Sequence, residues 1–537
     1  MSHGAIHRDV HGAARRSHDL IVIGGGIYGA CVALDAARRG RRPLLLEQAD
    51  FGGGVSRASL RIIHGGLRYL QSLDLRRSRE SAREQRWFLA AFPDLARPLA
   101  CIMPLDGRGL RRPWAFRSAL ALARALGQRP CADDRAPVPA PGVLAPEEAS
   151  RWLGALDLRS LSPAGVWHDA VMTCPERVLI EIIRWACACG TEALNYVEVT
   201  DLLTGPGGAV AGVRAQDVVA GDVEEFRAPV VINCAGPSCA ALANRLDRTG
   251  PDRGDLFAPS LAFNLLLDVP PPCNAAVAVR RDAPGSRTYF LVPCAGRVLA
   301  GTFHDACAAD CADPRPTEAQ IARFIADLRA AAPGLGASRD CVLAVLSGLL
   351  PAHPPGTARQ AERPRIVHHA DLGGPRDLWS VSGVKYTTAR AVAERVVSAA
   401  LPAPRHERRP PADTQRPATD TWPGLLDPRG PDNGPEAAAH IRRIAATESV
   451  VHLDDLVLRR TAWGLVPADA LAAGRTAAAM LGWDRERCER ELRRLARAVG
   501  LPSTAATAQG PAPTPTARAV AAASGVGAPP FPQGGTP

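Results

Sequence analysis

Three glycines and one glutamate near the N-terminus have the spacing of a nucleotide-binding turn. Gly24, Gly26 and Gly29 form a G-x-G-x-x-G pattern, and Glu47 follows 18 residues after Gly29. Glycine permits a tight turn and the close approach of a pyrophosphate, and the unpaired N–H groups that open the next helix attract the anion. A carboxylate at Glu47 accepts hydrogen bonds from ribose hydroxyls and repels a 2′-phosphate. The pattern therefore predicts a dinucleotide site.

A second glycine-rich segment follows, with the sequence FGGGVSRASLRIIHGGLRYLQ. Its first half carries Ser56, Arg57 and Ser59, which could bind the pyrophosphate and a ribityl chain. Its second half carries Gly65 and Gly66, whose missing side chains would let the backbone lie close to a flat ring. These residues favour a cofactor longer than NAD. The alternative is a polar surface loop followed by an ordinary helix start.

Lys385 is the only lysine in a chain that has 64 basic residues, all the others being arginine. It lies in the segment VSGVKYTTAR, between a strand-like run and a helical run opened by Thr387 and Thr388. Lysine is a compact charge on a flexible stem and can accept a proton when partly desolvated, whereas the arginine fork is larger and permanently charged. The residue type alone makes Lys385 a candidate for proton transfer, and the family resemblance described below implies a catalytic role for it. The alternative is a surface lysine that survived by chance.

The elements that must position these residues are of mixed α/β type. Around the glycine turn, apolar residues at Ile27, Ala30, Cys31 and Leu34 share one helical face. The expected strands are 19–23, 43–47, 229–234 and 260–269, and a hairpin is expected over 288–302. The expected helices are 27–39, 74–91 and 110–127, and helical periodicity returns over 436–499.

Composition sets further limits. The chain has 537 residues, enough for several domains, and no apolar run approaches the roughly 18–20 residues of a membrane-spanning helix. No hydrophobic segment follows the first methionine, which predicts a cytoplasmic protein. The 14 cysteines form no C-x-x-C pair, so we expect reduced thiols and no metal. The net charge of +10 is scattered and aromatic residues are only 5%, so no nucleic acid is expected.

Four stretches together resemble a known family. DLIVIGGGIYGA, IIHGGLRYLQ, VVINCAGP and SGVKYTTAR are similar, in this order and spacing, to the FAD-dependent glycerol-3-phosphate dehydrogenases, within the larger group of D-amino-acid-oxidase-like flavoproteins. The likeness covers about 18–400 and continues more weakly through LDDLVLRRTAWGL. It implies a discontinuous Rossmann-like FAD domain, an inserted antiparallel-sheet substrate domain and a C-terminal helical domain.

The domain boundaries that follow are stated here as expectations. They are a disordered tail over 1–17, an FAD domain over 18–72, 170–250 and 365–400, a substrate domain over 73–169 and 251–364, a Pro/Arg-rich linker over 401–435, a helical domain over 436–500 and a disordered tail over 503–537.

The resemblance also implies roles for individual residues. The helix after Lys385 would point its positive N-terminus at the flavin, and Lys385 would reach the substrate or the flavin from below the ring. His64, Arg68 and Tyr69 would lie beside the reacting face, although His64 could equally hold its loop and Arg68 could be a surface cation. The expected FAD-binding residues are Gly24, Gly26, Ile27, Tyr28, Gly29, Glu47, Ser56, Arg57, Ser59, Gly65, Gly66, Val199, Gly236, Gly383, Lys385 and Thr387.

The chain departs from the family where phosphate would be recognised. The family has Gly-x-Arg-Pro near the end of the substrate domain, whereas this chain reads SGLLPA, with Leu350 in the place of the arginine. The family's Gly-Ser-His and Gly-Thr-Thr-Asp patterns become PSLAFN and GTFHD, so that Leu261 and Phe263 lie in the first of them. Loss of a bidentate arginine removes a strong contact to a phosphate dianion. Arg363 or Arg365 could compensate.

The resulting interpretation is an FAD-dependent dehydrogenase that oxidises a secondary alcohol, foremost sn-glycerol 3-phosphate to dihydroxyacetone phosphate, with quinone as acceptor. The alternatives are an FAD oxidoreductase for another small hydroxy or amino acid, and a non-catalytic or nucleic-acid-associated flavoprotein. Residues 110–127 alternate basic and apolar side chains, which is compatible with attachment to the inner face of the cell membrane. Packing of this helix on the substrate domain is the alternative.

Overall fold

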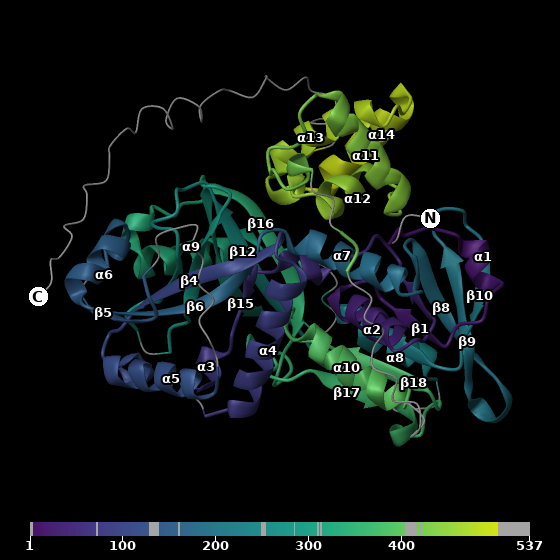
Figure 1. Cartoon of the computed structure of the whole chain (residues 1–537), viewed down its shortest axis with the longest axis horizontal. Helices are drawn as coiled ribbons and strands as arrows, with labels where there is room; N and C mark the ends of the chain where they lie inside the picture. Colours follow the sequence, from purple (N-terminus) through teal and green to yellow (C-terminus); the bar gives the residue numbers. More distant parts are fainter. Residues whose placement is uncertain are drawn as a thin grey trace, which may run out of the picture.

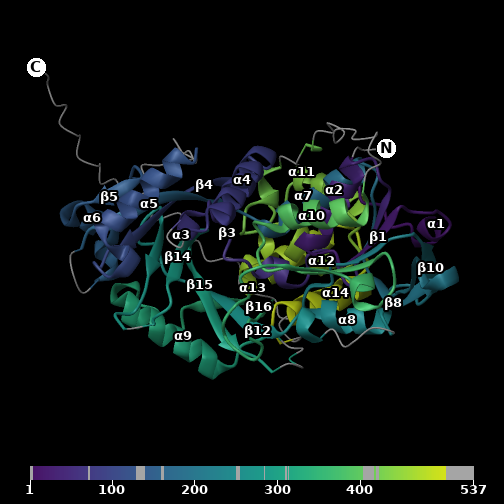
Figure 2. The same ribbon diagram turned by 90° about the horizontal axis from the view of Figure 1, so that it is seen from below.

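The computed structural model describes residues 4–70, 73–127, 139–158, 162–248, 254–283, 285–308, 311, 314–402, 416–418 and 422–502. These residues form a layered α/β part, a part built on a large sheet, and a group of helices near the end of the chain (Figure 1). The two sheet-containing parts lie side by side in both views, and the C-terminal helices lie across the α/β part (Figures 1 and 2).

The α/β part contains a six-stranded sheet with the order β17-β18-β11-β1-β2-β7. Its strands are β1 (Leu20–Ile23), β2 (Pro43–Leu46), β7 (Glu192–Leu194), β11 (Val231–Asn233), β17 (Arg365–His368) and β18 (Leu378–Ser382). All neighbours pair in parallel except β17 with β18. Strands covered on both faces are continuous apolar runs, which is why the strands expected around the glycine turn are confirmed.

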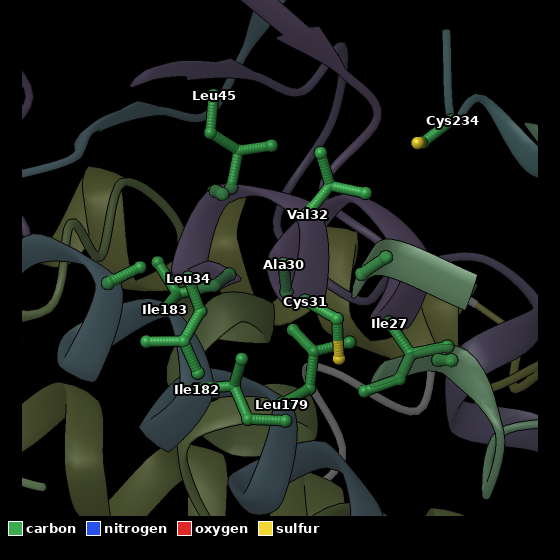
Figure 3. Packing of buried hydrophobic residues seen from close by; sticks show 14 of the residues in the cluster. Ile27, Ala30, Cys31, Val32, Leu34, Leu45, Leu179, Ile182, Ile183 and Cys234 are labelled. Carbon is green, nitrogen blue, oxygen red and sulfur yellow. The ribbon is translucent and has the colours of Figure 1, made fainter. Parts of the chain in front are cut away.

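Alternate residues of β1 face two different layers. Leu20 and Val22 pack against the helices α2 (Ile27–Arg38), α7 (Pro175–Ala188) and α10 (Ala389–Ala400). Figure 3 shows side chains of α2 and α7 lying together around Cys31. Ile21 and Ile23 pack on the opposite side, against α8 (Cys239–Leu246) and the antiparallel strands β8 (Val197–Thr204), β9 (Val210–Asp217) and β10 (Val223–Arg227). The predicted Rossmann-like layering is confirmed.

The large sheet has nine strands and is mostly antiparallel. Its strands are β3 (Ile62–Ile63), β4 (Ala96–Pro104), β5 (Gly142–Leu144), β6 (Ala164–Met172), β12 (Pro259–Leu267), β13 (Ala276–Val279), β14 (Tyr289–Cys294), β15 (Arg297–Ala306) and β16 (Val342–Pro351). The neighbouring helices are α3 (Leu67–Leu70), α4 (Leu75–Ala91), α5 (Pro113–Ala125), α6 (Pro146–Leu153) and α9 (Glu318–Ala331). Because a strand alternates its side chains between faces, one side of this sheet can pack on a helix while the other lines a cleft.

Helix α9 covers one face of the large sheet. The ring of Phe324 lies 5.7 Å from that of Phe263 and 5.3 Å from that of Phe303. The next residues along the two strands, Ala262 and His304, are paired across β12 and β15 and point the other way. Their face of the sheet is the one that borders the cleft described below.

The C-terminal helices form a core of their own around the fully buried Trp463. They are α11 (Pro435–Thr447), α12 (Leu453–Asp455), α13 (Pro467–Met480) and α14 (Arg485–Ala498). Trp422 and Leu425 belong to the same core, so the predicted linker of 401–435 is wrong at its end. Much of the remaining linker and the predicted tail of 503–537 lie outside the described residues.

Residues 4–17 are ordered, which corrects the prediction of a disordered N-terminal tail. Helix α1 (Val10–Ala14) buries Val10 and Ala13, and Ile6 is 1% exposed. The Ile6 N–H donates to the carbonyl of Thr447 at 2.8 Å, so this segment joins the C-terminal helices to the α/β part. Three apolar residues at helical spacing within a polar segment were too weak a pattern to predict this packing.

Neither a membrane span nor a metal cluster is found in the described part of the chain. No helix there is long and apolar enough to cross a bilayer. No group of three or more His, Cys, Asp or Glu residues there could hold a metal ion. Every cysteine of the described residues is a free thiol.

Candidate active site and cofactor cleft

Gly24, Gly26 and Gly29 of the glycine turn are each required for a different structural reason. Gly24 has φ of +103°, and a side chain there would approach the carbonyl of Cys234 at 2.6 Å. A Cβ on Gly29 would lie 1.9 Å from the carbonyl oxygen of Gly24, so this glycine lets α2 pack on the turn. A Cβ on Gly26 would meet only the Oγ of Ser56, at 3.3 Å. Gly26 is therefore the glycine that keeps the space in front of the helix open for a ligand.

Glu47 braces the turn from the end of β2. Its carboxylate accepts hydrogen bonds from the N–H of Gly25 at 2.6 Å and from the N–H of Ala49 at 2.9 Å. Burial raises its pKa, and these two N–H groups oppose the rise. The carboxylate lies at the cleft wall with its orientation fixed, as a ribose ligand requires.

The segment after Glu47 supplies polar groups to the start of α2. The Ser56 hydroxyl accepts from the N–H of Ile27 at 3.0 Å, and the Ser59 hydroxyl accepts from the N–H of Arg61 at 2.9 Å. The Arg57 side chain forms no hydrogen bond or ion pair with the described residues, and burial lowers its pKa. A half-buried guanidinium without a carboxylate partner fits an anionic ligand such as a pyrophosphate.

The two sheet-containing parts and the C-terminal helices together line a cleft of about 1660 Å³, the latter through residues such as Leu465 and Pro467. This exceeds the roughly 300–1,000 Å³ of an ordinary small-ligand site, so it accommodates a cofactor of dinucleotide size together with a substrate. The predicted cofactor residues that line it are Gly24, Gly26, Ile27, Tyr28, Glu47, Ser56, Arg57, Ser59, Val199, Gly236, Gly383 and Lys385. Gly29 and Thr387 lie just behind the wall, in the turn and at the approach to α10.

Gly65 and Gly66 do not line this cleft. A Cβ on Gly66 would lie 2.7 Å from the carbonyl oxygen of Ser78, and one on Gly65 would lie 2.7 Å from Gln85. Both neighbours belong to α4, so the two glycines allow that helix to pack closely on the loop. This arrangement favours a packing role for Gly65 and Gly66, and not the predicted position against the cofactor ring.

Tyr28 fixes the backbone on which Lys385 is carried. Its hydroxyl donates to the Lys385 carbonyl at 2.8 Å and accepts from the N–H groups of Val384 at 2.9 Å and Lys385 at 3.0 Å. A Cβ on Gly383 would lie 2.1 Å from the Tyr28 ring, so glycine is needed for this approach. Burial raises the pKa of Tyr28 to about 12. The Lys385 backbone is thus held rigidly at the cleft wall.

Lys385 and Tyr69, both predicted to be catalytic, are brought together by the fold although they are 316 residues apart in the sequence. The Lys385 Nζ contacts the Tyr69 hydroxyl and lies 4.7 Å from the centre of its ring. Tyr69 lies in α3, and so does Arg68, whose side chain lies outside what the structure describes. The Lys385 amine and the Tyr69 hydroxyl can therefore exchange a proton with each other.

His64 stands at the end of β3 and is held by Asp169, a residue that sequence reasoning missed. The His64 Nδ1 lies 2.9 Å from one carboxylate oxygen of Asp169, and the other oxygen accepts from the N–H of Gly65 at 2.7 Å. Burial alone would raise the pKa of Asp169, but His64 and Gly65 hold it below its ordinary value. The His64 side chain is 50% exposed and does not line the cleft, so its contacts favour the loop-holding role over contact with substrate.

The substrate side of the cleft has an aliphatic side chain at Leu350, and polar residues such as Ser347 and Gln360 line it as well. Leu350 lines the cleft, whereas Arg363 and Arg365 do not. Arg365 is paired with Asp255 at 2.8 Å. Neither arginine that could have compensated for Leu350 reaches the cleft in this structure.

His304 is a second cleft residue that sequence reasoning missed. Its Nδ1 is buried and has no hydrogen-bond partner in the described part of the protein. Burial and the nearby Arg287 lower its pKa to about 4, so the ring is neutral at pH 7. The departure GTFHD pointed to this position, but only the register of β15 with β12 shows that His304 faces the cleft.

The fold and the cleft define a flavoprotein with a dinucleotide half and a sheet-lined substrate half. Residues 19–399 match the FAD dependent oxidoreductase family, and the chain belongs to it. The protein is thus an FAD-dependent oxidoreductase, which confirms the predicted family and cofactor.

Several proteins that are similar in sequence or structure to this chain are named as glycerol-3-phosphate dehydrogenases. A glycerol-3-phosphate dehydrogenase of Synechocystis sp. is 29% identical over 390 residues, which is 71% of this chain and 69% of that protein. The mitochondrial glycerol-3-phosphate dehydrogenase SDP6 of Arabidopsis thaliana is 29% identical over 71% of this chain and 60% of its own length. A crystal structure of the glycerol-3-phosphate dehydrogenase from Bacillus halodurans complexed with FAD superposes with a TM-score of 0.67 at 21% identity, covering 92% of this chain and 97% of the other.

Proposed function

We propose that this protein oxidises sn-glycerol 3-phosphate to dihydroxyacetone phosphate and passes the electrons to a quinone. The observation that carries the proposal is the Lys385–Tyr69 pair beside a cleft that fits FAD. The names of the relatives in Synechocystis and Arabidopsis support the choice of substrate. Aerobic glycerol-3-phosphate dehydrogenase of Bacillus subtilis, 27% identical over 71% of the chain, supports a respiratory acceptor.

The residues of the chain divide the work between binding and proton transfer. Gly26, Arg57 and Glu47 would hold FAD, which supplies a two-electron hydride acceptor when it is bound. The Lys385–Tyr69 pair holds the hydroxyl of the reacting alcohol by a hydrogen bond and, in the form in which the lysine is a neutral amine, takes the hydroxyl proton to become the ammonium. The carbon loses a hydride as the hydroxyl loses its proton, so a secondary alcohol leaves as a ketone. The two electrons and two protons reduce one quinone to one quinol.

The assay for this activity follows quinone reduction by the FAD-loaded protein. We expect reduction of a soluble quinone that depends on glycerol 3-phosphate, with dihydroxyacetone phosphate as product. If small hydroxy or amino acids drive the reaction and glycerol 3-phosphate does not, the proposed substrate is wrong.

A different small hydroxy or amino acid remains the second candidate, and Leu350 and His304 favour it. At Leu350 and His304 the cleft carries an aliphatic side chain and a neutral ring, where a phosphate dianion would gain from a guanidinium. Arg245, Arg315 and Arg339 also line the cleft. In the second candidate function, the substrate would carry, in place of the phosphate of glycerol 3-phosphate, a group that is smaller or uncharged.

Replacing Leu350 with arginine separates the two candidates. If Leu350 weakens phosphate binding, Leu350→Arg should raise the preference for glycerol 3-phosphate over glycerol by roughly ten- to a hundredfold, the worth of one charged hydrogen-bonded contact. The measurement is kcat/KM for both alcohols, and Leu350→Met is the control that keeps the volume without the charge. An unchanged preference, with tight use of glycerol 3-phosphate by the original protein, would show that another group already binds the phosphate.

The membrane hypothesis concerns helix α5. Phe116 and Leu120 of this helix are buried against the large sheet, which favours packing as the reason for much of its apolar face. Trp114, however, is 63% exposed, and Arg117 on the same helix is exposed too. An exposed tryptophan beside basic residues suits the surface of an anionic membrane, where a quinone is within reach.

We expect the protein to float with anionic liposomes at low salt and to be released as the salt concentration rises. Trp114→Ser should reduce the bound fraction. Val219→Ser is the matched control, since Val219 is also an exposed apolar residue, at 50%, but lies in the turn between β9 and β10. Absence of flotation at low salt would remove the membrane argument.

A further inference from the structure

Asp50 lies between two segments that line the cofactor cleft. Glu47 precedes it by three residues, and the residues from Gly52 to Ser59 follow it along the cleft wall. Asp50 itself is 2% exposed. Its carboxylate accepts from the guanidinium of Arg460 at 2.7 and 2.8 Å, from the side chain of Asn195 at 2.8 Å and from Arg459.

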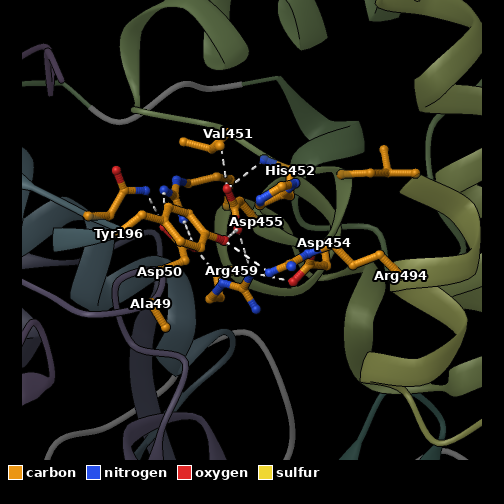
Figure 4. Close-up of polar contacts among 12 residues, drawn as sticks. Ala49, Asp50, Tyr196, Val451, His452, Asp454, Asp455, Arg459 and Arg494 are labelled. Carbon is orange, nitrogen blue, oxygen red and sulfur yellow. Dashed lines mark hydrogen bonds and ion pairs between the residues drawn. The ribbon is translucent and has the colours of Figure 1, made fainter. Parts of the chain in front are cut away.

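The two arginines belong to the C-terminal helices, about 410 residues further along the chain. They end a single π-helical turn, Leu456–Arg460, that continues α12. Such a wide turn changes the direction of successive side chains, and here both arginines reach the same carboxylate. Arg459 also donates to Asp454 at 2.9 Å and to Asp455 at 2.7 Å (Figure 4). The Arg459 side chain is therefore held by carboxylates of its own helical part as well as by Asp50.

The positive charges of Arg459 and Arg460 stabilise the ionised form of Asp50. Burial alone would raise the pKa of Asp50, but Arg460 and Arg459 hold it well below its ordinary value. Both arginines are almost fully buried. Removing one member of such a group leaves the other charges buried and unpaired, which is strongly unfavourable.

The loop is tied at its other side to the strands of the α/β part. The N–H of Val197 donates to the Glu47 carbonyl and that of Tyr196 donates to the Ala49 carbonyl, both at 2.8 Å. The Tyr196 hydroxyl in turn donates to Asp455 at 2.6 Å (Figure 4). The backbone around Asp50 is thus held between the start of β8 and the C-terminal helices.

We propose that the C-terminal helices position the FAD-binding loop. Arg459 and Arg460, acting through Asp50, hold residues 47–57 in the shape that places Glu47 and Arg57 at the cleft wall. Asp50 is a positioning residue because it does not itself line the cleft. The inference depends on FAD as the cofactor and is independent of which alcohol is oxidised.

The structure offers a matched pair for the test. Arg177 on α7 and Glu448 beyond α11 form an ion pair at 2.7 and 2.8 Å, and they are 0% and 3% exposed. This pair also joins the α/β part to the C-terminal helices but does not touch the loop of residues 47–57. It meets Arg460 only through the main-chain carbonyls of Arg460 and Glu448, at 3.2 and 3.0 Å, which Glu448→Gln leaves in place. Loss of either contact should lower the thermal midpoint, whereas only loss of the Asp50 contact should loosen the cofactor.

The experiment uses the full chain freed of flavin and titrated with FAD by fluorescence. We expect Asp50→Asn to raise the dissociation constant of FAD by roughly tenfold or more, and Glu448→Gln to leave it within about twofold while still lowering the thermal midpoint. Arg460→Lys, which keeps the charge but loses the bidentate contact, should give an intermediate affinity and serves if Asp50→Asn does not fold. Unchanged FAD affinity in a folded Asp50→Asn or Arg460→Lys protein, or equal weakening in Glu448→Gln, would overturn the proposal.

Discussion

Lys385→Met is expected to retain FAD while reducing the rate of flavin reduction by roughly 10²–10⁴-fold, the usual contribution of one positioned proton-transfer group. Methionine fills a similar volume but cannot carry charge or accept a proton. The backbone of Val384 and Lys385 is held by Tyr28 through three hydrogen bonds that involve no side-chain atom of Lys385. The substitution should therefore leave the cleft wall in place. Stopped-flow absorbance under anaerobic conditions measures the rate.

Lys385→Arg is the informative comparison. Arginine restores the charge but brings a planar fork that cannot be deprotonated, so we expect it to recover little of the rate. Tyr69→Phe removes the hydroxyl that Lys385 contacts and keeps the ring, and it should cause a smaller loss than Lys385→Met. Near-normal reduction by the arginine variant would mean that the lone lysine reflects composition rather than chemistry.

Gly26→Val is expected to yield a folded but colourless protein. Around Gly26 the nearest atom to an added Cβ is the Ser56 Oγ at 3.3 Å, and no other protein atom lies within 4 Å. A valine therefore intrudes on the ligand space and not on the core, in contrast to Gly29, where the Gly24 carbonyl would be struck at 1.9 Å. Flavin absorbance of the purified protein, together with circular dichroism, reports both effects.

The control for this substitution is Gly154→Val, at a helical position with φ of −58° and open space around it. It should keep both the colour and the fold. Full FAD occupancy in Gly26→Val would place the pyrophosphate elsewhere than in front of the glycine turn. Bound NADP in the original protein would contradict the ribose interpretation of Glu47.

The features that could be predicted from the sequence are those encoded locally. The glycine turn and Glu47 are confined to a single strand–turn–helix–strand unit, and Lys385 stood out because its residue type is unique in the chain. Gly65 and Gly66 show the limit of such local patterns. Their lack of side chains was visible, but whether a ring or a helix fills the space depends on α4.

The residues that were missed depend on contacts between distant segments. Asp169 reaches His64 because β6 pairs with β3 across more than 100 residues, and no motif marks it. His304 faces the cleft because of its register with Ala262. The contact of Asp50 with Arg460 spans 410 residues. Periodicity within a segment predicts which face is buried, but it does not say which partner covers that face.

The most direct test of the proposed function is a single anaerobic turnover. The FAD-loaded protein is mixed with excess sn-glycerol 3-phosphate, and the flavin absorbance is followed while the product is quantified. We predict complete bleaching, one dihydroxyacetone phosphate for each flavin, and slower bleaching when C2 of the substrate carries deuterium. A flavin that stays oxidised with glycerol 3-phosphate at any concentration, yet is bleached by another hydroxy or amino acid, would contradict the proposal.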